Sequence, residues 1–199
     1  MVQHKQHLDS LRQKDSLRGV EATEISVYLG NYSASHFEGS AHIHANDDET
    51  SRQPDDALAM LTADHRQVRA LFQQYTGTSD PYLKQIIAEH IFAELTLHTL
   101  LEETVFYPAV AEQADAEGKQ LVDEALQDHQ EIKALIETLQ EIDDDAVFEA
   151  QFQALQTQVE QHIEEEETRM FPEAAQVLAS HWEEITALLQ ELKEHILAS

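Results

Sequence analysis

The feature that most constrains this chain is an internal repeat with an offset of 64 residues. The segment His98–Pro108 contains a His, a Glu-Glu-Thr run, an aromatic residue and a Pro, and these recur at the same spacing in His162–Pro172. Upstream, Asp64-His65 returns as Asp128-His129 at the same offset. A repeat of this kind predicts two equivalent structural units, each with one early histidine and one later His-x-x-x-Glu.

The charge balance limits the partners we expect. The 199 residues include 39 acidic and 12 basic ones, which gives a formal net charge of −27. A field of that sign repels nucleic acid and anionic membranes and attracts cations. The chain has no cysteine, which excludes disulfides, iron–sulfur clusters and thiolate zinc sites. No apolar run approaches the roughly 18 residues of a membrane helix. We therefore expect a cytoplasmic protein without nucleic-acid or membrane partners.

From Pro54 onward, apolar residues recur every three or four positions, which predicts amphipathic helices. We expect four long ones over about 55–75, 81–113, 119–142 and 146–178, and a shorter fifth that Ser180 caps. Gly77 should end the first helix in a left-handed cap, and Pro108 should kink the second. The sequence thus predicts an all-α, up-down-up-down four-helix bundle with a short C-terminal fifth helix, as one domain over residues 54–199.

Residues 1–53 have no long apolar period, and the stretch from Ser33 to Ser51 is polar. We expect a largely irregular or flexible N-terminal extension. His42 and His44 could bind a surface metal, but solvated histidines in a flexible arm are the more common reading of such a pair. The sequence assigns this segment no function.

The helical positions of the repeated residues predict a shared centre. Residues i and i+4 lie on one face of a helix, so His98 with Glu102, and His162 with Glu166, each direct two donor groups to one side. His65 and His129 lie on the inward faces of their own helices. The predicted metal ligands are His65, His98, Glu102, His129, His162 and Glu166.

Such a centre calls for cations, because two carboxylates buried among apolar side chains would each cost several kcal/mol. Two cations would each take two imidazoles, and the carboxylates could bridge them together with an oxide, a hydroxide or a water. Mixed nitrogen and oxygen ligands with open positions suit two non-haem iron ions, and manganese or zinc after them.

Each part of this pattern has a structural alternative. A single histidine on a helix face is usually a core residue, and one His-x-x-x-Glu is a weak signal. His90 and Glu94 share the spacing, but their repeat counterparts, Ala154 and Gln158, cannot do the same. The joint occurrence of six matched residues is what favours the metal centre.

Three acids next to the centre each have two interpretations. Glu94, Asp64 and Asp128 are candidate acceptors for the second N–H of the histidines, or else simply exposed acids. Tyr107 and its counterpart Phe171 are expected to fill the end of the bundle rather than take part in chemistry.

This pattern, Asp-His followed by His-x-x-x-Glu-Glu-x-x-x-x-Pro and given twice, resembles the hemerythrin-like HHE cation-binding family over about residues 55–175. The resemblance implies a four-helix bundle with a non-haem di-iron centre on the same six positions. Ala125 stands where the oxygen-carrying hemerythrins have a further histidine, and His162-x-x-x-Glu166 stands where they have His-x-x-x-x-Asp. The chain is closer to the four-His, two-Glu branch, which includes iron-sensing, peroxide-consuming and iron-centre repair proteins. The repair proteins typically carry N-terminal cysteines, which are absent here.

These observations predict a di-iron protein that binds or senses O2, NO or peroxide. The alternatives are a di-iron enzyme that consumes peroxide or delivers iron in repair under oxidative or nitrosative stress, and a metal-stabilised acidic partner module. The protein partner, and whether any substrate turns over, stay open. The Glu-x-x-His of ferritin-like sites and the His-Glu-x-x-His of zinc proteases are absent.

Overall fold

The computed structural model describes residues 56–198, and the described part contains helices and short connections but no strand. The expected N-terminal extension, residues 1–53, lies outside the described residues, as do His42 and His44.

The first half of the repeat is a helical hairpin. Helix α3 (Asp56–Gly77) is followed by α4 (Pro81–Leu101), a π-helical turn η3 (Glu102–Phe106) and α5 (Tyr107–Gln113). Asp80 caps α4, because its carboxylate accepts the backbone N–H groups of Tyr82 and Leu83, and Pro81 begins the helix.

The second half repeats this arrangement. Helix α6 (Ala116–Gln140) leads to α7 (Asp145–Glu165), a second π-helical turn η4 (Glu166–Met170) and α8 (Phe171–Val177). Asp115 and Asp144 cap α6 and α7 with their carboxylates. The last helix, α9, spans Trp182–Leu197.

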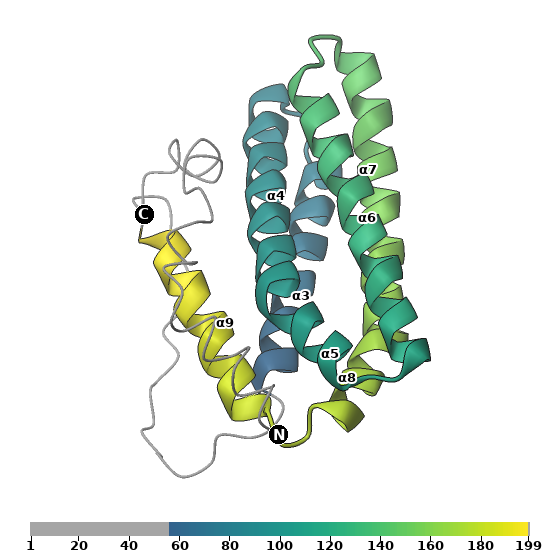
Figure 1. The fold of residues 1–199 in the computed structure, drawn as a ribbon. Helices are drawn as coiled ribbons and strands as arrows, with labels where there is room; N and C mark the ends of the chain where they lie inside the picture. Colours follow the sequence, from purple (N-terminus) through teal and green to yellow (C-terminus); the bar gives the residue numbers. More distant parts are fainter. Residues whose placement is uncertain (1–55, 199) are drawn as a thin grey trace.

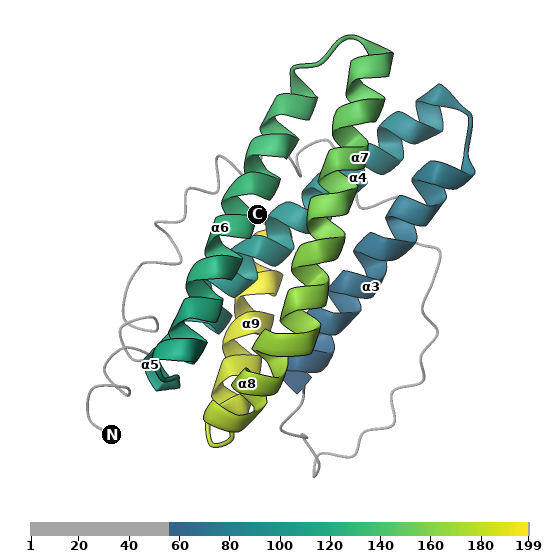
Figure 2. The ribbon, with the colours of Figure 1, turned by 90° about the vertical axis from the view of Figure 1, so that its right-hand side faces the viewer.

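The four long helices run alternately up and down in one bundle, as Figures 1 and 2 show. Helix α9 lies outside the bundle, where it contacts α3, α4 and η3. The predicted all-α bundle with a short C-terminal helix is confirmed for the described residues.

At three helix ends the local expectations were wrong in whole or in part, although Gly77 does end the first helix as expected. Gly77 is the last residue of α3, but no described glycine has a positive φ, so it makes no left-handed cap. Helix α6 begins at Ala116, before Gly118, because Asp115 is the capping residue. Ser180 does not cap α9; the residue before that helix is His181, which makes no side-chain capping bond.

The two π-helical turns stand where the sequence predicted only a kink at Pro108. In each turn a backbone N–H reaches back five residues instead of four, from Tyr107 to the carbonyl of Glu102 and from Phe171 to that of Glu166. Such a turn accommodates one extra residue and is frequent at functional sites. It comes just before each proline, whose ring would clash with an ordinary helical turn. Figure 1 shows α5 leaving the line of α4 after this point.

The core consists of two apolar clusters. One gathers residues of α3, α4, α6 and α7 near the hairpin loops, including Phe72, Ile132 and Phe152. The other gathers the opposite ends of the helices together with α9, including Leu61, Phe106 and Trp182. On α3 and α6 the predicted histidine ligand lies between the residues of one cluster and those of the other, and on α4 and α7 it lies next to the boundary between the two clusters. A polar layer therefore crosses the middle of an otherwise apolar bundle.

Candidate metal centre

The structure brings all six predicted ligands into this polar layer. Each of the four long helices contributes one histidine, and the two π-helical turns begin with the two glutamates. None of the six side chains is more than 4% exposed. Burial this complete is rare for glutamate and histidine unless partners compensate for the lost hydration.

The histidines form two pairs, one in each half of the molecule. The Nε2 atoms of His65 and His98 lie 3.1 Å apart, and those of His129 and His162 lie 3.0 Å apart. All four imidazoles therefore turn the same ring nitrogen toward the centre. The rings within each pair meet edge to face, at 71° and 66°.

Each glutamate reaches one histidine of either pair. The Oε2 atom of Glu102 lies 3.1 Å from Nε2 of His98 and 3.3 Å from Nε2 of His129. The Oε2 atom of Glu166 lies 3.1 Å from Nε2 of His65 and 3.4 Å from Nε2 of His162. Both carboxylates thus span the two histidine pairs.

A bound cation would satisfy these donor atoms better than hydrogen bonds among the six side chains do. Two overlapping groups have ligand atoms close enough to share an ion, namely His65, His98, Glu102 and Glu166, and Glu102, His129 and His162. The Oε1 atom of Glu102 is buried without a hydrogen-bond partner. A buried carboxylate oxygen without a partner is costly, and a metal ion would satisfy it.

The two carboxyls differ in their proton affinity when no ion is bound. Burial raises the pKa of Glu102 well above its usual value, and the charge of Glu166 raises it further. Burial also acts to raise the pKa of Glu166, but the nearby His162 and His65 outweigh it and lower that pKa. Burial lowers the pKa of His98 to about 4. The pocket therefore keeps a carboxylate and a neutral imidazole ready for a cation, as metal binding requires.

The outer ring nitrogens face acidic side chains. Nδ1 of His65 lies 3.0 Å from Oε1 of Glu167, and Nδ1 of His129 lies 2.9 Å from Oε1 of Glu103. Glu167 also forms an ion pair with Arg69, and Glu103 forms one with Lys133. An acceptor at Nδ1 holds the proton there and leaves Nε2 free to bind a metal.

The sequence identified only some of these outer partners. Asp64 and Asp128, two of the candidate acceptors, lie 3.9 and 3.6 Å from Nδ1 of His98 and His162, which is too far for a hydrogen bond, and both ring nitrogens are buried without a partner. Glu94 does not reach the centre, because it pairs with His90. Glu103 and Glu167 were missed, although the second Glu of each Glu-Glu doublet recurs at the repeat offset.

Tyr107 packs in the apolar cluster at the end of the bundle, as predicted, but its hydroxyl also reaches the centre, which the sequence did not predict. Its hydroxyl donates a hydrogen bond to Oε1 of Glu166 at 2.7 Å, and it lies 3.1 Å from Nε2 of His129 and 3.4 Å from Oε2 of Glu102. Burial and the two glutamate charges raise the pKa of Tyr107 well above its usual value, so the hydroxyl keeps its proton. Phe171, its repeat counterpart, stacks on His65 with the ring centroids 5.5 Å apart.

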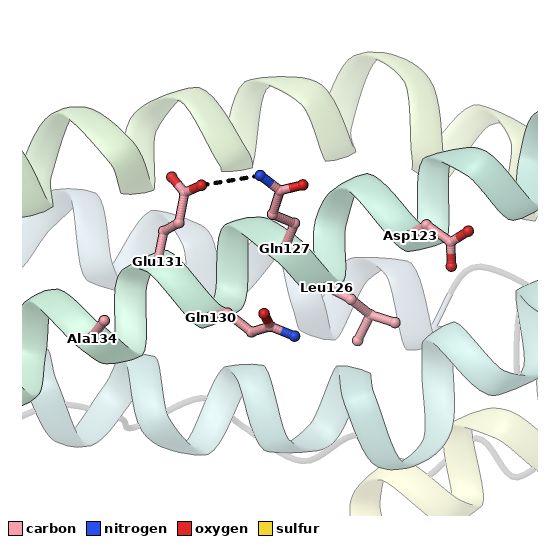
Figure 3. Close-up of a pocket in the computed structure, with 6 residues that line it drawn as sticks. All are labelled: Asp123, Leu126, Gln127, Gln130, Glu131 and Ala134. Atoms are coloured by element: carbon pink, nitrogen blue, oxygen red, sulfur yellow. Dashed lines mark hydrogen bonds between the residues drawn. The ribbon is translucent and has the colours of Figure 1, made fainter.

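Two hollows lie along α6. A surface groove of about 630 Å³ follows Asp123, Gln127 and Glu131 and contains no histidine (Figure 3). A much narrower cavity of about 10 Å³ reaches His162 and Glu166. The larger hollow is therefore separate from the six residues, and the smaller one touches them.

An antiparallel helical bundle with buried histidines and glutamates across its middle defines a metal-binding helical protein. The model of the family described as the hemerythrin HHE cation binding domain matches residues 56–174. The chain belongs to this family, as its resemblance predicted. The match ends before α9 begins.

A curated relative is known by its name as a DNA nickase, from Nostoc sp. (strain PCC 7120 / SAG 25.82 / UTEX 2576). It is 30% identical over 114 residues, which cover 56% of this chain and 31% of that protein. The chain therefore spans about a third of that relative's length. No solved structure matches the chain significantly. Among the described helices, none has the length and apolar character to cross a membrane.

Proposed function

We propose that the chain is a non-haem di-iron protein that binds or senses a small ligand, O2, NO or peroxide, at a centre of four histidines and two glutamates. The observation that carries this proposal is the arrangement of the carboxylates. Glu102 and Glu166 each lie within 3.4 Å of an imidazole from both histidine pairs. Two carboxylates placed between two nitrogen pairs suit a pair of ions rather than one.

In this proposal His65 and His98 would hold one ion, His129 and His162 would hold the other, and Glu102 and Glu166 would offer a carboxylate to both. An ion held by three or four protein ligands keeps coordination positions free, and imidazole with carboxylate is a donor set that iron accepts. Iron, when bound, would supply these free positions and a reversible change of oxidation state. Six ligands that lie on four different helices would also tie the bundle together.

The surrounding residues prepare the ligands. Glu103 and Glu167 accept the Nδ1–H groups of His129 and His65, so that both rings present Nε2 to the centre. The Tyr107 hydroxyl donates to Glu166 and fixes the direction of that carboxylate. The apolar clusters on both sides keep bulk water away from the layer.

Metal content tests the proposal directly. Glu102→Ala or Glu166→Ala should remove most of the iron, because either change takes away a bridging ligand. Glu164→Ala is the matched control, since Glu164 is an exposed glutamate of the same acidic run. Elemental analysis of the purified variants measures the result. Equal iron loss in all three variants would contradict the assignment.

Spectroscopy of the iron-loaded protein separates binding from turnover. A binding or sensing protein should show a reversible change of its absorption bands with O2, NO or peroxide. Steady release of O2 from peroxide would instead favour the alternative, a peroxide-consuming enzyme. Insensitivity to all three ligands would leave the metal a structural role.

Nucleic acid is not part of the proposal. The relative named as a DNA nickase shares only part of its length with this chain, and a net charge of −27 opposes contact with phosphates. We expect no cut in supercoiled plasmid after incubation with the iron-loaded protein. Agarose gel electrophoresis measures this, and conversion to open circles that EDTA prevents would contradict it.

A further inference from the structure

The two halves of the molecule match at the ligands but not at the side chains that cover them. In the first half the layer above the histidine pair is apolar and fully enclosed, with Leu61, Leu101 and Phe106 each 0% exposed. Helix α9 seals this side, because its residues Ile185, Leu189 and Leu192 belong to the same buried cluster. Figure 1 shows α9 beside α3 and α4.

At the repeat offset, the second half has different side chains in the same places. Ala125 stands for Leu61, Glu165 for Leu101 and Arg169 for Val105. Arg169 is half exposed, and it pairs with Glu124 at 3.2 Å and with Glu165 at 3.8 Å. Where the first half has packed hydrocarbon, the second half has a small residue under a pair of surface charges.

The narrow cavity of about 10 Å³ lies at this spot. Its lining includes Arg169 and Glu124, which are 50% and 39% exposed, as well as Ala125, Asp128 and the buried His162 and Glu166. That volume is roughly what one water molecule needs. The cavity therefore lies between the surface and the buried His162 and Glu166, and it has room only for very small molecules.

We propose that this cavity is the portal through which ligands reach the candidate metal centre, and that it selects small uncharged molecules over anions. This inference rests on the proposed function. Ala125 sets the width, because a larger residue there would occupy the cavity. Glu124, Asp128 and Glu165 set the charge, because the single positive charge of Arg169, which pairs with Glu124 and Glu165, offsets only one of the three negative charges. Nitric oxide, dioxygen and hydrogen peroxide fit this chemistry, and azide does not.

Association rates with nitric oxide, measured by stopped-flow absorbance on the iron-loaded full chain, test the width of the portal. Ala125→Leu introduces the residue that the first half carries at Leu61, and it should slow the association at least about tenfold, since one or two methylene groups already discriminate on that scale in a tight pocket. Ala134→Leu makes the same change on an exposed position of α6 and should leave the rate unchanged.

A second variant keeps the test valid if Ala125→Leu does not fold. Leu121→Trp changes a partly exposed residue at the mouth of the cavity, without adding volume next to the histidines, and should slow nitric oxide several-fold. Circular dichroism and iron content establish that each variant is folded and loaded. If both variants hold iron and bind nitric oxide as fast as the wild type, the portal is refuted while the proposed function stands. If the wild type itself binds no iron, the proposed function fails first.

The charge selection has its own test. The double change Glu124→Gln and Glu165→Gln should raise the azide association rate several-fold and leave the nitric oxide rate unchanged. High salt should reduce the difference between the variant and the wild type, because it screens exposed charges. An azide rate that does not respond to these changes would overturn the charge selection.

Discussion

Tyr107 and Phe171 hold equivalent positions in the two halves, yet only Tyr107 carries a hydroxyl, and that hydroxyl meets both glutamates. Without an ion, Glu166 depends on this donor for one of its buried oxygens. The single oxygen atom by which the two side chains differ therefore makes the otherwise matched centre unequal.

We predict that Tyr107→Phe lowers the unfolding free energy of the metal-free protein by about 1–3 kcal/mol, the cost of leaving a buried acceptor without its partner. Urea unfolding measures this. Tyr75→Phe is the control: its hydroxyl donates to Glu149, whose carboxylate is 41% exposed and can turn to water, so the loss should be about 1 kcal/mol or less. Equal losses would show that the hydroxyl of Tyr107 has no special role.

The repeat was enough to predict which six side chains meet, because matched offsets and i,i+4 spacing do not depend on the details of the helix. The same reasoning failed for Tyr107. In an α-helix, residues five apart point in different directions, and only the π-helical turn brings Tyr107 over Glu102. Glu103 and Glu167 were missed because a second acid in a run ordinarily faces solvent.

At the scale of single helices, the sequence located the starts of α4 and α7, which Asp80 and Asp144 cap, but placed the start of α6 after the position that Asp115 caps. Glycines were less informative, because the sequence does not tell a glycine needed for its φ from one needed for its small size. Gly118 is of the second kind: an added Cβ would lie 2.6 Å from Cβ of Ala114 and 3.1 Å from Oε1 of Glu173.

Two glycine substitutions should therefore act in opposite directions. Gly118→Ala should destabilise the protein by about 1–3 kcal/mol, since the start of α6 must move away from its neighbours. Gly77→Ala meets nothing within 4 Å and keeps a helical φ, so it should stabilise by up to about 1 kcal/mol. Thermal unfolding of both variants measures the difference, and the same sign for both would contradict this account.

At the scale of the whole molecule, the polar layer divides the core, and the metal would join its two parts. Iron(II) added without air should stabilise the metal-free protein and so raise its melting temperature. At a free iron concentration one hundred times the dissociation constant, binding at one site adds about 2.7 kcal/mol to the free energy of unfolding. Differential scanning calorimetry measures the shift. Glu102→Ala should show little of it, and an equal shift in that variant would point to binding elsewhere.

The charge of the whole chain gives a separate expectation. At −27 the molecule repels itself, so the metal-free protein should become more stable as sodium chloride rises from about 0.01 to 0.5 M, because added salt shortens the range of the repulsion. Melting temperatures at several salt concentrations test this. A flat or falling series would show that the ion pairs, such as Lys193 with Asp64, outweigh the repulsion.

The matched π-helical turns also bear on what each hairpin can hold by itself. A turn of this kind lies at the same place in both hairpins, and in each it begins with the buried glutamate. One hairpin alone carries two imidazoles and one carboxylate, which is half of the six donors. The complete set exists only where the two hairpins face each other.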